Sequence, residues 1–398
     1  MLKGKTVLVC VTGGIASYKM ANCVSMLVKL HADVHVIMTK NATNFINPVT
    51  FETLSSNKCM VDTFDRNFQF NVAHVALAKK ADVCLISPAT ANVIGKIANG
   101  IADDMLTTTV MACTCKVLIA PAMNTAMYRN HIVQDNIDKL RRFGYEIIEP
   151  DSGYLACGDT GEGKMPAEEV LVDHILRQAA YDKDMEGLKV IVSAGPTQEP
   201  MDPVRYISNH STGKMGYEIA KAAVRRGARV TLVSGKTNLP PVRFAENISV
   251  VSAEEMFEAF KSRFKDYDII IKAAAVADYR PAKAAEDKIK KKDCDMSIEL
   301  TRNHDIIKYM GENRREGQFI CGFSMETQNM IENSRAKIYK KNIDMIVANN
   351  LKQSGAGFGT DTNIVTVITK DEMIQLDKMS KESVSNELLS IILKKIGH

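Results

Sequence analysis

The sequence contains no tryptophan, and only 6% of its residues are aromatic. It also has little excess charge of either sign, because 51 lysine and arginine residues stand against 47 aspartate and glutamate residues, a net charge of +4. A general nucleic-acid binder needs a much larger basic excess. Nucleic acid is therefore not an expected partner, and any basic site must be local.

Long apolar runs are missing as well. The apolar stretches have the length of strands and are interrupted by glycine, proline or charge, well short of the roughly 20 residues that span a bilayer. No membrane segment is therefore expected. The nine cysteines are irregularly spaced, and no signal-peptide pattern precedes the first apolar run at residues 6–11. We expect reduced thiols and a cytoplasmic protein.

What is present is the composition of a folded protein, with 45% hydrophobic and 25% charged residues in a chain of 398. At roughly 150 residues per domain, this length predicts two or three domains. Each is large enough to bury a core.

In the first half, β-branched runs alternate with helical patterns. A strand at 6–11, a helix at 15–30 and a strand at 33–39 predict a βαβ unit. The alternation continues with strands predicted at 82–87, 116–120 and 145–148 and with helices at 89–97 and 129–142. The strands are almost continuously apolar, which is typical of a parallel sheet covered on both faces.

A polar segment at 178–187 interrupts this pattern, which then repeats. Strands are predicted at 188–193, 228–233, 248–251, 268–272, 318–324 and 344–348, and helices at 215–226, 253–265 and 329–341. The predicted fold class is α/β, with two doubly wound, Rossmann-like domains at residues 1–180 and 187–398.

Two turns of small residues follow strands of the first half. One of these turns lacks the full GxGxxG spacing and is equally well explained as a capped strand-to-helix turn. Both turns would nevertheless meet at one edge of the sheet. Together they indicate a mononucleotide site at a topological switch point. The candidate cofactor-binding residues are Gly13, Gly14, Ile15, Ser17, Thr39, Ser87, Pro88, Ala89, Thr90 and Asn92.

Three single residues of this half are candidates for chemistry. His74 stands at the predicted entrance to a helix, although a lone histidine is more often structural. Asn124 follows a predicted strand, where a buried turn is the alternative. Cys157 lies in a stretch with four glycines in eleven residues, which is typical of a mobile flap, and its thiol could act as an acid or base.

Zinc is a weak rival explanation for Cys113, Cys115 and Cys157. A CxC pair without a second pair gives poor spacing for a tetrahedral site.

In the second half, small residues precede the helix predicted at 215–226. Backbone amides of the SNHSTGKMG segment at 208–216 would converge on the helix N-terminus, which favours an anion, although a capped helix is the plain alternative. Ala273, Ala274 and Ala275 follow a predicted strand and would let a base or ribose approach the backbone. Asp278 could hold a magnesium ion or a ribose hydroxyl.

Basic residues are concentrated at 288–292, where four of five are lysines. A solvated loop or a nuclear address would explain this run, and a triphosphate that needs mobile cations is a third explanation. Lys337 and Lys341 project together from one predicted helix face. Further candidates after strands are Asn303, His304, Asp305, Ile306 and Phe323. The glycine-rich stretch at 355–359 follows no strand and is interpreted as a flexible loop.

The motifs of the first half resemble the flavin-containing cysteine decarboxylase family. They are His74, the turn at 87–92, PAMNTAMY at 121–128 and ACGD at 156–159, with Tyr128 where the family pattern ends in tryptophan. The resemblance implies a flavodoxin-like flavoprotein domain that binds FMN, assembles into trimers and decarboxylates a peptide-like cysteine. It also implies that His74 is an essential base, that Asn124 holds the substrate carboxylate and that Cys157 is the acid.

The second half resembles the phosphopantothenate and cysteine ligase family through SNHSTGKMG, AAAVADY at 273–279, KIKK at 288–291 and GFSMET at 322–327. This implies dimers and a CTP-dependent ligase that forms an acyl cytidylate, which cysteine then attacks. By the same resemblance Asn209 stabilises the acyl cytidylate and Lys288 neutralises phosphate charge. Asp278 serves the nucleotide or Mg²⁺, and Lys337 and Lys341 join the CTP pocket.

Together the halves resemble the bifunctional decarboxylase and ligase family of bacterial coenzyme A synthesis. Two other classes stay open at this point. One is a catalytically silent flavin-fold regulatory subunit, which the joint presence of His74, Asn124 and Cys157 disfavours. The other is a nicotinamide oxidoreductase, which the missing GxGxxG turn disfavours.

Overall fold

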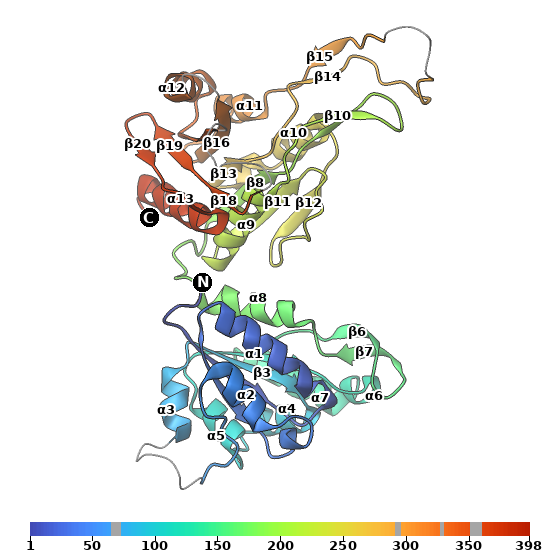
Figure 1. The fold of residues 1–398 in the computed structure, drawn as a ribbon, viewed down its shortest axis with the longest axis vertical. Coiled ribbons are helices and arrows are strands. Elements are labelled where there is room, and N and C mark those ends of the chain that lie inside the picture. Colours follow the sequence, from blue (N-terminus) through green and yellow to red (C-terminus); the bar gives the residue numbers. More distant parts are fainter. Residues whose placement is uncertain (65–72, 291–295, 327–329, 351–359) are drawn as a thin grey trace. The chain divides into compact units, whose positions relative to one another are not determined.

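The computed structural model describes residues 1–64, 73–290, 296–326, 330–350 and 360–398. The chain divides into two compact units, Met1–Asp182 and Lys183–His398, each with its own sheet and helices (Figure 1). Lys291, Lys292, Thr327 and the glycine-rich stretch at 355–359, which the sequence motifs include, lie outside the described residues. In the part of the chain that is described, no helix is long and apolar enough to cross a membrane.

The first unit is built on a five-stranded parallel sheet of order β2-β1-β3-β4-β5. Its strands are β1 (Thr6–Val11), β2 (Asp33–Met38), β3 (Val83–Ala89), β4 (Lys116–Pro121) and β5 (Glu146–Ile147). This is the flavodoxin-like order, in which the chain changes direction across the sheet between β1 and β3. Ligands of such sheets bind outside the carboxyl ends of the strands at that point.

Helices cover both faces of this sheet. They are α1 (Met20–Lys29), α2 (Pro48–Ser55), α3 (Ala73–Lys80), α4 (Ala91–Ala98), α5 (Met105–Ala112), α6 (Thr125–Tyr128), α7 (His131–Arg142) and α8 (Glu168–Ala179). Successive residues of β1 serve opposite faces: Val9 packs with α1 and α8, whereas Leu8 packs with α4, α5 and α7. The continuous apolar run of β1 follows from this burial on both sides.

The second unit is built on an eight-stranded sheet of order β12-β11-β8-β13-β16-β17-β19-β20. Its strands are β8 (Lys189–Ala194), β11 (Arg229–Ser234), β12 (Glu246–Ser249), β13 (Ile269–Lys272), β16 (Phe319–Glu326), β17 (Met345–Asn350), β19 (Val365–Thr369) and β20 (Met373–Gln375). From β12 to β17 the strands are parallel and follow the Rossmann order 3-2-1-4-5-6, and β19 and β20 then pair antiparallel. The switch point lies between β8 and β13.

Two apolar clusters flank this sheet as well. Helices α9 (Lys214–Arg225) and α13 (Lys381–Ile396) pack on one face. Helices α10 (Ala253–Lys261), α11 (Ile306–Glu312) and α12 (Met330–Lys341) contribute to the cluster on the other face. Three short antiparallel pairs complete the unit, namely β9 (Gln198–Pro200) with β10 (Tyr206–Ser208), β14 (Tyr279–Pro281) with β15 (Leu300–Arg302), and β18 (Thr362–Asn363) with β21 (Met379–Ser380). The hairpin of β14 and β15 extends from the body of the unit as an arm (Figure 1).

Candidate active sites

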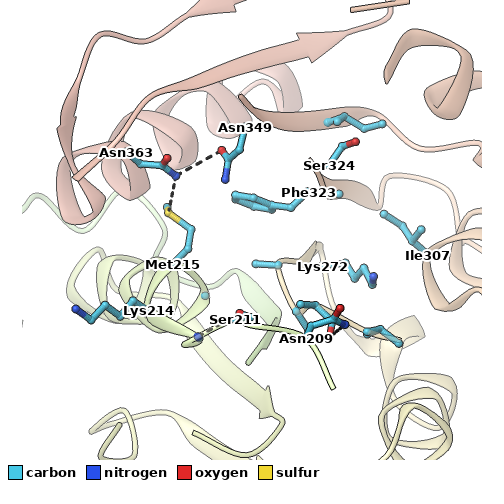
Figure 2. Close-up of a pocket in the computed structure, with 18 of the residues that line it drawn as sticks. Asn209, Ser211, Lys214, Met215, Lys272, Ile307, Phe323, Ser324, Asn349 and Asn363 are labelled. Atoms are coloured by element: carbon cyan, nitrogen blue, oxygen red, sulfur yellow. Dashed lines mark hydrogen bonds between the residues drawn. The ribbon is translucent and has the colours of Figure 1, made fainter. Parts of the chain in front are cut away.

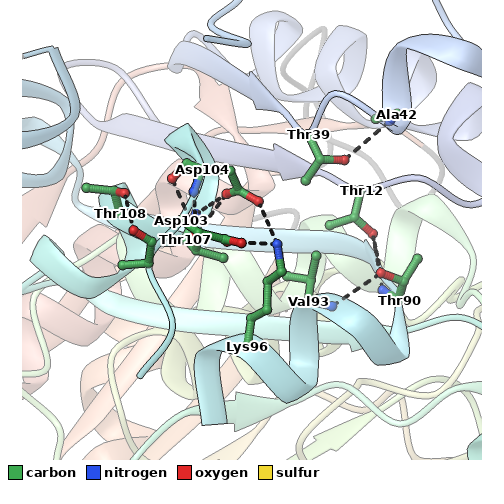
Figure 3. A network of polar contacts seen from close by, with 11 residues as sticks. Thr12, Thr39, Ala42, Thr90, Val93, Lys96, Asp103, Asp104, Thr107 and Thr108 are labelled. Carbon is green, nitrogen blue, oxygen red and sulfur yellow. Dashed lines mark hydrogen bonds and ion pairs between the residues drawn. The ribbon is translucent and has the colours of Figure 1, made fainter. Parts of the chain in front are cut away.

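The loops after β1 and β3 are tied together at the switch point of the first unit. Thr12 Oγ1 donates a hydrogen bond to the Pro88 carbonyl at 2.5 Å and accepts one from the Thr90 amide at 3.1 Å. Figure 3 shows Thr12 facing Thr90, which caps α4. Ser17 Oγ donates to the Thr12 carbonyl at 2.7 Å and closes the first turn. These contacts hold the two predicted turns together at the carboxyl ends of β1 and β3.

A third loop, after β2, lies against the first. A Cβ on Gly13 would stand 2.6 Å from the Asn41 Cβ, so glycine is needed for this close approach. Thr39 begins the third loop, and its amide donates to the Val11 carbonyl at 3.0 Å. The structure thus gathers the loops that carry Gly13, Gly14, Thr39 and residues 87–90. Ile15 and Asn92 lie exposed beside them.

One buried polar group beside these loops has no hydrogen-bond partner among the described residues. Ser87 is fully buried at the carboxyl end of β3, and its hydroxyl makes no hydrogen bond among the described residues. Buried hydroxyl groups are almost always hydrogen-bonded, so an orphaned one beside three ligand-facing loops suits a bound polar group. Farther along, Lys96 bridges to Asp103 at 2.7 Å and ties α4 to the start of α5 (Figure 3).

A second cluster lies where β4 ends. The Asn124 side-chain amide donates to Asp159 Oδ2 at 2.8 Å and to the Cys157 Sγ at 3.3 Å, and the thiol lies 3.4 Å from the same Asp159 oxygen. Asn124 Oδ1 accepts from the Ala126 amide at 2.8 Å and caps α6. The structure therefore joins two predicted residues and adds Asp159, to which the sequence analysis gave no role although it belongs to the ACGD motif.

The glycine-rich segment around Cys157 is a β-hairpin of β6 (Asp151–Tyr154) and β7 (Thr160–Lys164). It packs on the Asn124 segment, with the Met123 amide donating to the Gly163 carbonyl at 2.9 Å. A Cβ on Gly163 would stand 2.3 Å from the Met123 carbonyl oxygen. Gly163 thus permits a close contact between the hairpin and the Asn124 segment, and Cys157 lies exposed at the end of the hairpin.

Two further predicted positions lie outside this cluster. His74 lies half-buried at the start of α3, and the described residues show no contact between it and Asn124 or Cys157. Tyr128, where the family pattern has tryptophan, is buried and donates from its hydroxyl to Glu149 at 3.1 Å. Burial raises the pKa of Tyr128 to about 12, so it stays a neutral donor.

The second unit has a pocket of about 360 Å³ at its switch point (Figure 2). Small residues shape it: a Cβ on Gly216 would meet the Ala194 Cβ at 2.6 Å, which lets α9 begin close to the end of β8. The Asn209 amide donates to the Ala275 carbonyl at 3.0 Å and links the loop before α9 to the loop after β13. The predicted residues that line the pocket are Asn209, Ala273, Ala274, Ala275, Asp278, Phe323, Lys337 and Lys341.

The pocket is strongly basic. Lys214, Lys272, Lys337, Lys341 and Lys381 line it, whereas Asp278 is the one acidic residue among the lining residues described. Burial, together with the neighbouring Lys341, lowers the pKa of Lys272 to about 8. Sequence reasoning missed Lys272 because it reads as the last residue of an apolar strand. A concave site with this charge attracts a polyanion.

The remaining predicted residues of this half do not line the pocket. Asp305 pairs with Lys341 at 2.9 Å and begins α11, with Ile306 buried behind it. Asn303 donates to the Ala277 carbonyl at 2.8 Å, and His304 stacks on Phe257 with ring centroids 4.5 Å apart. Of these four residues, Asp305 contacts the pocket lining through Lys341.

Lys288 is exposed on the segment between β14 and β15, away from the pocket lining.

No metal centre is preformed in the described part of the chain. Within it, no group of three or more histidine, cysteine, aspartate or glutamate side chains is arranged to hold an ion. A magnesium ion at Asp278 would take its other ligands from phosphate oxygens and water, as Mg²⁺ commonly does.

Both units match known families over nearly their whole lengths. Residues 1–180 match the family described as Flavoprotein, and residues 185–396 match the DNA/pantothenate metabolism flavoprotein C-terminal domain. The fold and its two sites thus define a flavoprotein joined to a domain of pantothenate metabolism.

Relatives share both domains. The chain is 48% identical over 396 residues to the coenzyme A biosynthesis bifunctional protein CoaBC of Bacillus subtilis, covering 98% of this chain and 97% of that protein. It is 42% identical over 394 residues to the CoaBC protein of Borreliella burgdorferi, covering 98% and 100%. A crystal structure of a CoaBC C-terminal domain is 42% identical, with a TM-score of 0.46, and covers 53% of this chain and 98% of that one.

The chain belongs to the CoaBC family, bifunctional enzymes of coenzyme A biosynthesis that combine a phosphopantothenoylcysteine decarboxylase with a phosphopantothenate–cysteine ligase. This confirms the family, the α/β fold class and the bifunctional enzyme expected from the motifs.

Proposed function

We propose that the first unit binds FMN in the crevice formed by the loops after β1, β2 and β3. The Flavoprotein family match, the joined loops and the orphaned Ser87 hydroxyl support this assignment. Gly13, Gly14, Ile15, Ser17, Thr39, Ser87, Pro88, Ala89, Thr90 and Asn92 would hold the group. When bound, the flavin supplies the hydride chemistry that a plain cysteine needs before it can lose carbon dioxide.

Asn124 and Cys157 are the residues that act on the substrate in this unit. The Asn124 amide already binds a carboxylate, that of Asp159 at 2.8 Å, so it is suited to hold the carboxylate of phosphopantothenoylcysteine. The Cys157 thiol then gives its proton to the carbon that has lost carbon dioxide, and solvent returns a proton to the sulfur. His74 serves as the base.

In the second unit the basic pocket takes CTP and 4'-phosphopantothenate. A carboxylate does not react with an amine directly because oxide is a poor leaving group, so it is first joined to CMP with release of pyrophosphate. Asn209 stabilises this acyl cytidylate, and Lys337, Lys341 and Lys288 balance phosphate charge. Cysteine then displaces CMP.

Asp278 would serve the nucleotide or its Mg²⁺. Asn303, His304, Asp305 and Ile306 belong to the same nucleotide site, in which Asp305 pairs with Lys341. We place the enzyme in the cytoplasm as a homo-oligomer, with trimers through the decarboxylase and dimers through the ligase.

The observation that carries this proposal is the pocket lined by five lysines at the switch point between β8 and β13. Two measurements on the purified protein test it. The protein should be yellow and release FMN on denaturation, and it should release pyrophosphate only when CTP, phosphopantothenate and cysteine are all present. A colourless protein, or one that releases no pyrophosphate, would contradict the corresponding half.

A further inference from the structure

The lysine-rich run at 288–290 is anchored to the body of the second unit at one residue. The Ile289 amide donates to Asp202 Oδ2 at 3.1 Å, and the Ile289 carbonyl accepts from Arg205 Nη2 at 2.9 Å. Both backbone groups of the residue between Lys288 and Lys290 are therefore held by one aspartate and one arginine. The same segment makes a further hydrogen bond to the body of the unit, from the Ala285 amide to the Met201 carbonyl at 2.9 Å.

Asp202 is itself rigidly held. It is 3% exposed, and its Oδ1 accepts from the Val204 and Arg205 amides, each at 2.8 Å. The Arg205 guanidinium donates to Oδ2 from Nε at 3.0 Å and from Nη2 at 2.5 Å. These donors, Arg205 foremost, hold the pKa of the Asp202 carboxyl well below its usual range. The carboxylate thus stays charged at working pH and its anchor at Ile289 persists.

We propose that Asp202 is a positioning residue for the ligase reaction: with Arg205 it fixes the backbone at Ile289 and so determines where the Lys288 ammonium group is presented to the triphosphate. This rests on the role proposed above for Lys288. A long lysine side chain on a free loop must lose backbone and side-chain freedom each time it meets a phosphate. An anchored backbone has lost part of that freedom already, which favours the ordered transition state.

Digestion with trypsin tests the anchor at Ile289 independently of enzyme activity, because residues 288–290 contain two lysines on one exposed segment. We expect trypsin to cleave this segment at least ten times faster in Asp202→Asn than in the unmodified chain. Digestion is carried out under native conditions, and mass spectrometry measures the rate of cleavage. Asp184→Asn is the matched control, since Asp184 also accepts two hydrogen bonds from one guanidinium, that of Arg226, but does not contact this segment. It should leave the cleavage rate unchanged.

Activity gives the second readout. We expect Asp202→Asn to lower kcat for CTP-dependent ligation about tenfold or more, with a smaller change in KM, as for an interaction realised mainly in the transition state. Decarboxylation by the same preparation is the internal control and should not change.

The outcomes separate the two claims. If Lys288→Gln alone leaves ligation intact, the proposed role of Lys288 is wrong, while trypsin still decides whether Asp202 anchors the segment. Unchanged cleavage in Asp202→Asn, or full ligation activity in that variant, would overturn the positioning role. If Asp202→Asn does not fold, Ile289→Pro removes the amide donor while Asp202 stays in place, and it should speed cleavage after Lys290 and lower ligation in the same way.

Discussion

The Cys157 thiol and the Lys272 ammonium group lie in very different surroundings, and each difference bears on chemistry. Cys157 is exposed at the end of a hairpin and within 3.4 Å of Asp159, so a substrate can reach it. Lys272 lies in a pocket with four other lysines. The charged form of the Lys272 side chain is disfavoured next to these lysines, and a bound anion would stabilise it.

Replacing Cys157 by serine should separate the steps of decarboxylation. A serine hydroxyl is a far weaker acid than a thiol, and loss of a general acid typically costs about 100-fold or more. We expect Cys157→Ser to reduce bound flavin, seen as loss of its visible absorbance, while product formation falls by about that factor. Cys59→Ser is a control on a buried thiol outside the site. Full product formation by Cys157→Ser would contradict the acid role.

Lys272 should make nucleotide binding depend on pH. Its pKa of about 8 lies below the ordinary 10.5, so at pH 8 about half of the free protein lacks this proton. A triphosphate favours the charged form, so binding at pH 8 should take up protons and affinity should fall as the pH rises through 8. Calorimetry in buffers of different ionisation enthalpy measures this uptake. The same uptake in Lys272→Met would assign it to another group.

At this scale the sequence predicted residues that stand in recognisable motifs and missed those defined by packing. Asn124 and Cys157 were expected separately, and only the folded hairpin brings them together with Asp159. Lys272 carries no motif at all. Its importance comes from burial and from Lys341, neither of which is visible in the order of residues.

Among the elements, the hairpin of β6 and β7 depends on glycine at its contact with the Asn124 segment. Gly163 has a φ of +117° and no room for a Cβ beside the Met123 carbonyl. We expect Gly163→Ala to lift the hairpin and cost about 2 kcal/mol or more in local strain. Decarboxylation should fall at least tenfold while ligation is kept.

Gly95→Ala tests whether that effect is specific. This glycine lies inside α4, where a Cβ would meet only ordinary contacts. The substitution should be neutral or stabilise the protein by up to about 1 kcal/mol, measured by denaturant unfolding. Equal losses in both variants would indicate that the hairpin contact has no special role.

The parallel strands were predictable and the antiparallel edge was not. Strands buried on both faces are continuous apolar runs, so β1, β3, β8 and β13 are evident in the sequence. Helix α8 and the elements after β17 were not predicted. Strand β20 and the partly polar α13 carry mixed patterns whose burial depends on the neighbours they meet.

The whole molecule consists of two units, each with its own apolar clusters, and our central proposal is that each unit carries one of the two chemistries. Motifs in both halves predicted the fold class and the family. The position of Lys288 relative to the pocket could not be predicted, because the order of residues does not show which surface a segment covers. Lys288→Gln should abolish ligation and leave decarboxylation intact.

The most direct test is one reaction followed by mass spectrometry, with phosphopantothenate, cysteine and CTP supplied to the unmodified chain, Cys157→Ser and Lys288→Gln. The unmodified chain should form phosphopantetheine, and Cys157→Ser should convert phosphopantothenate but form little phosphopantetheine. Lys288→Gln should form neither product from these substrates, yet decarboxylate phosphopantothenoylcysteine when that is supplied. Loss of both activities together in either folded variant would contradict the assignment of separate sites.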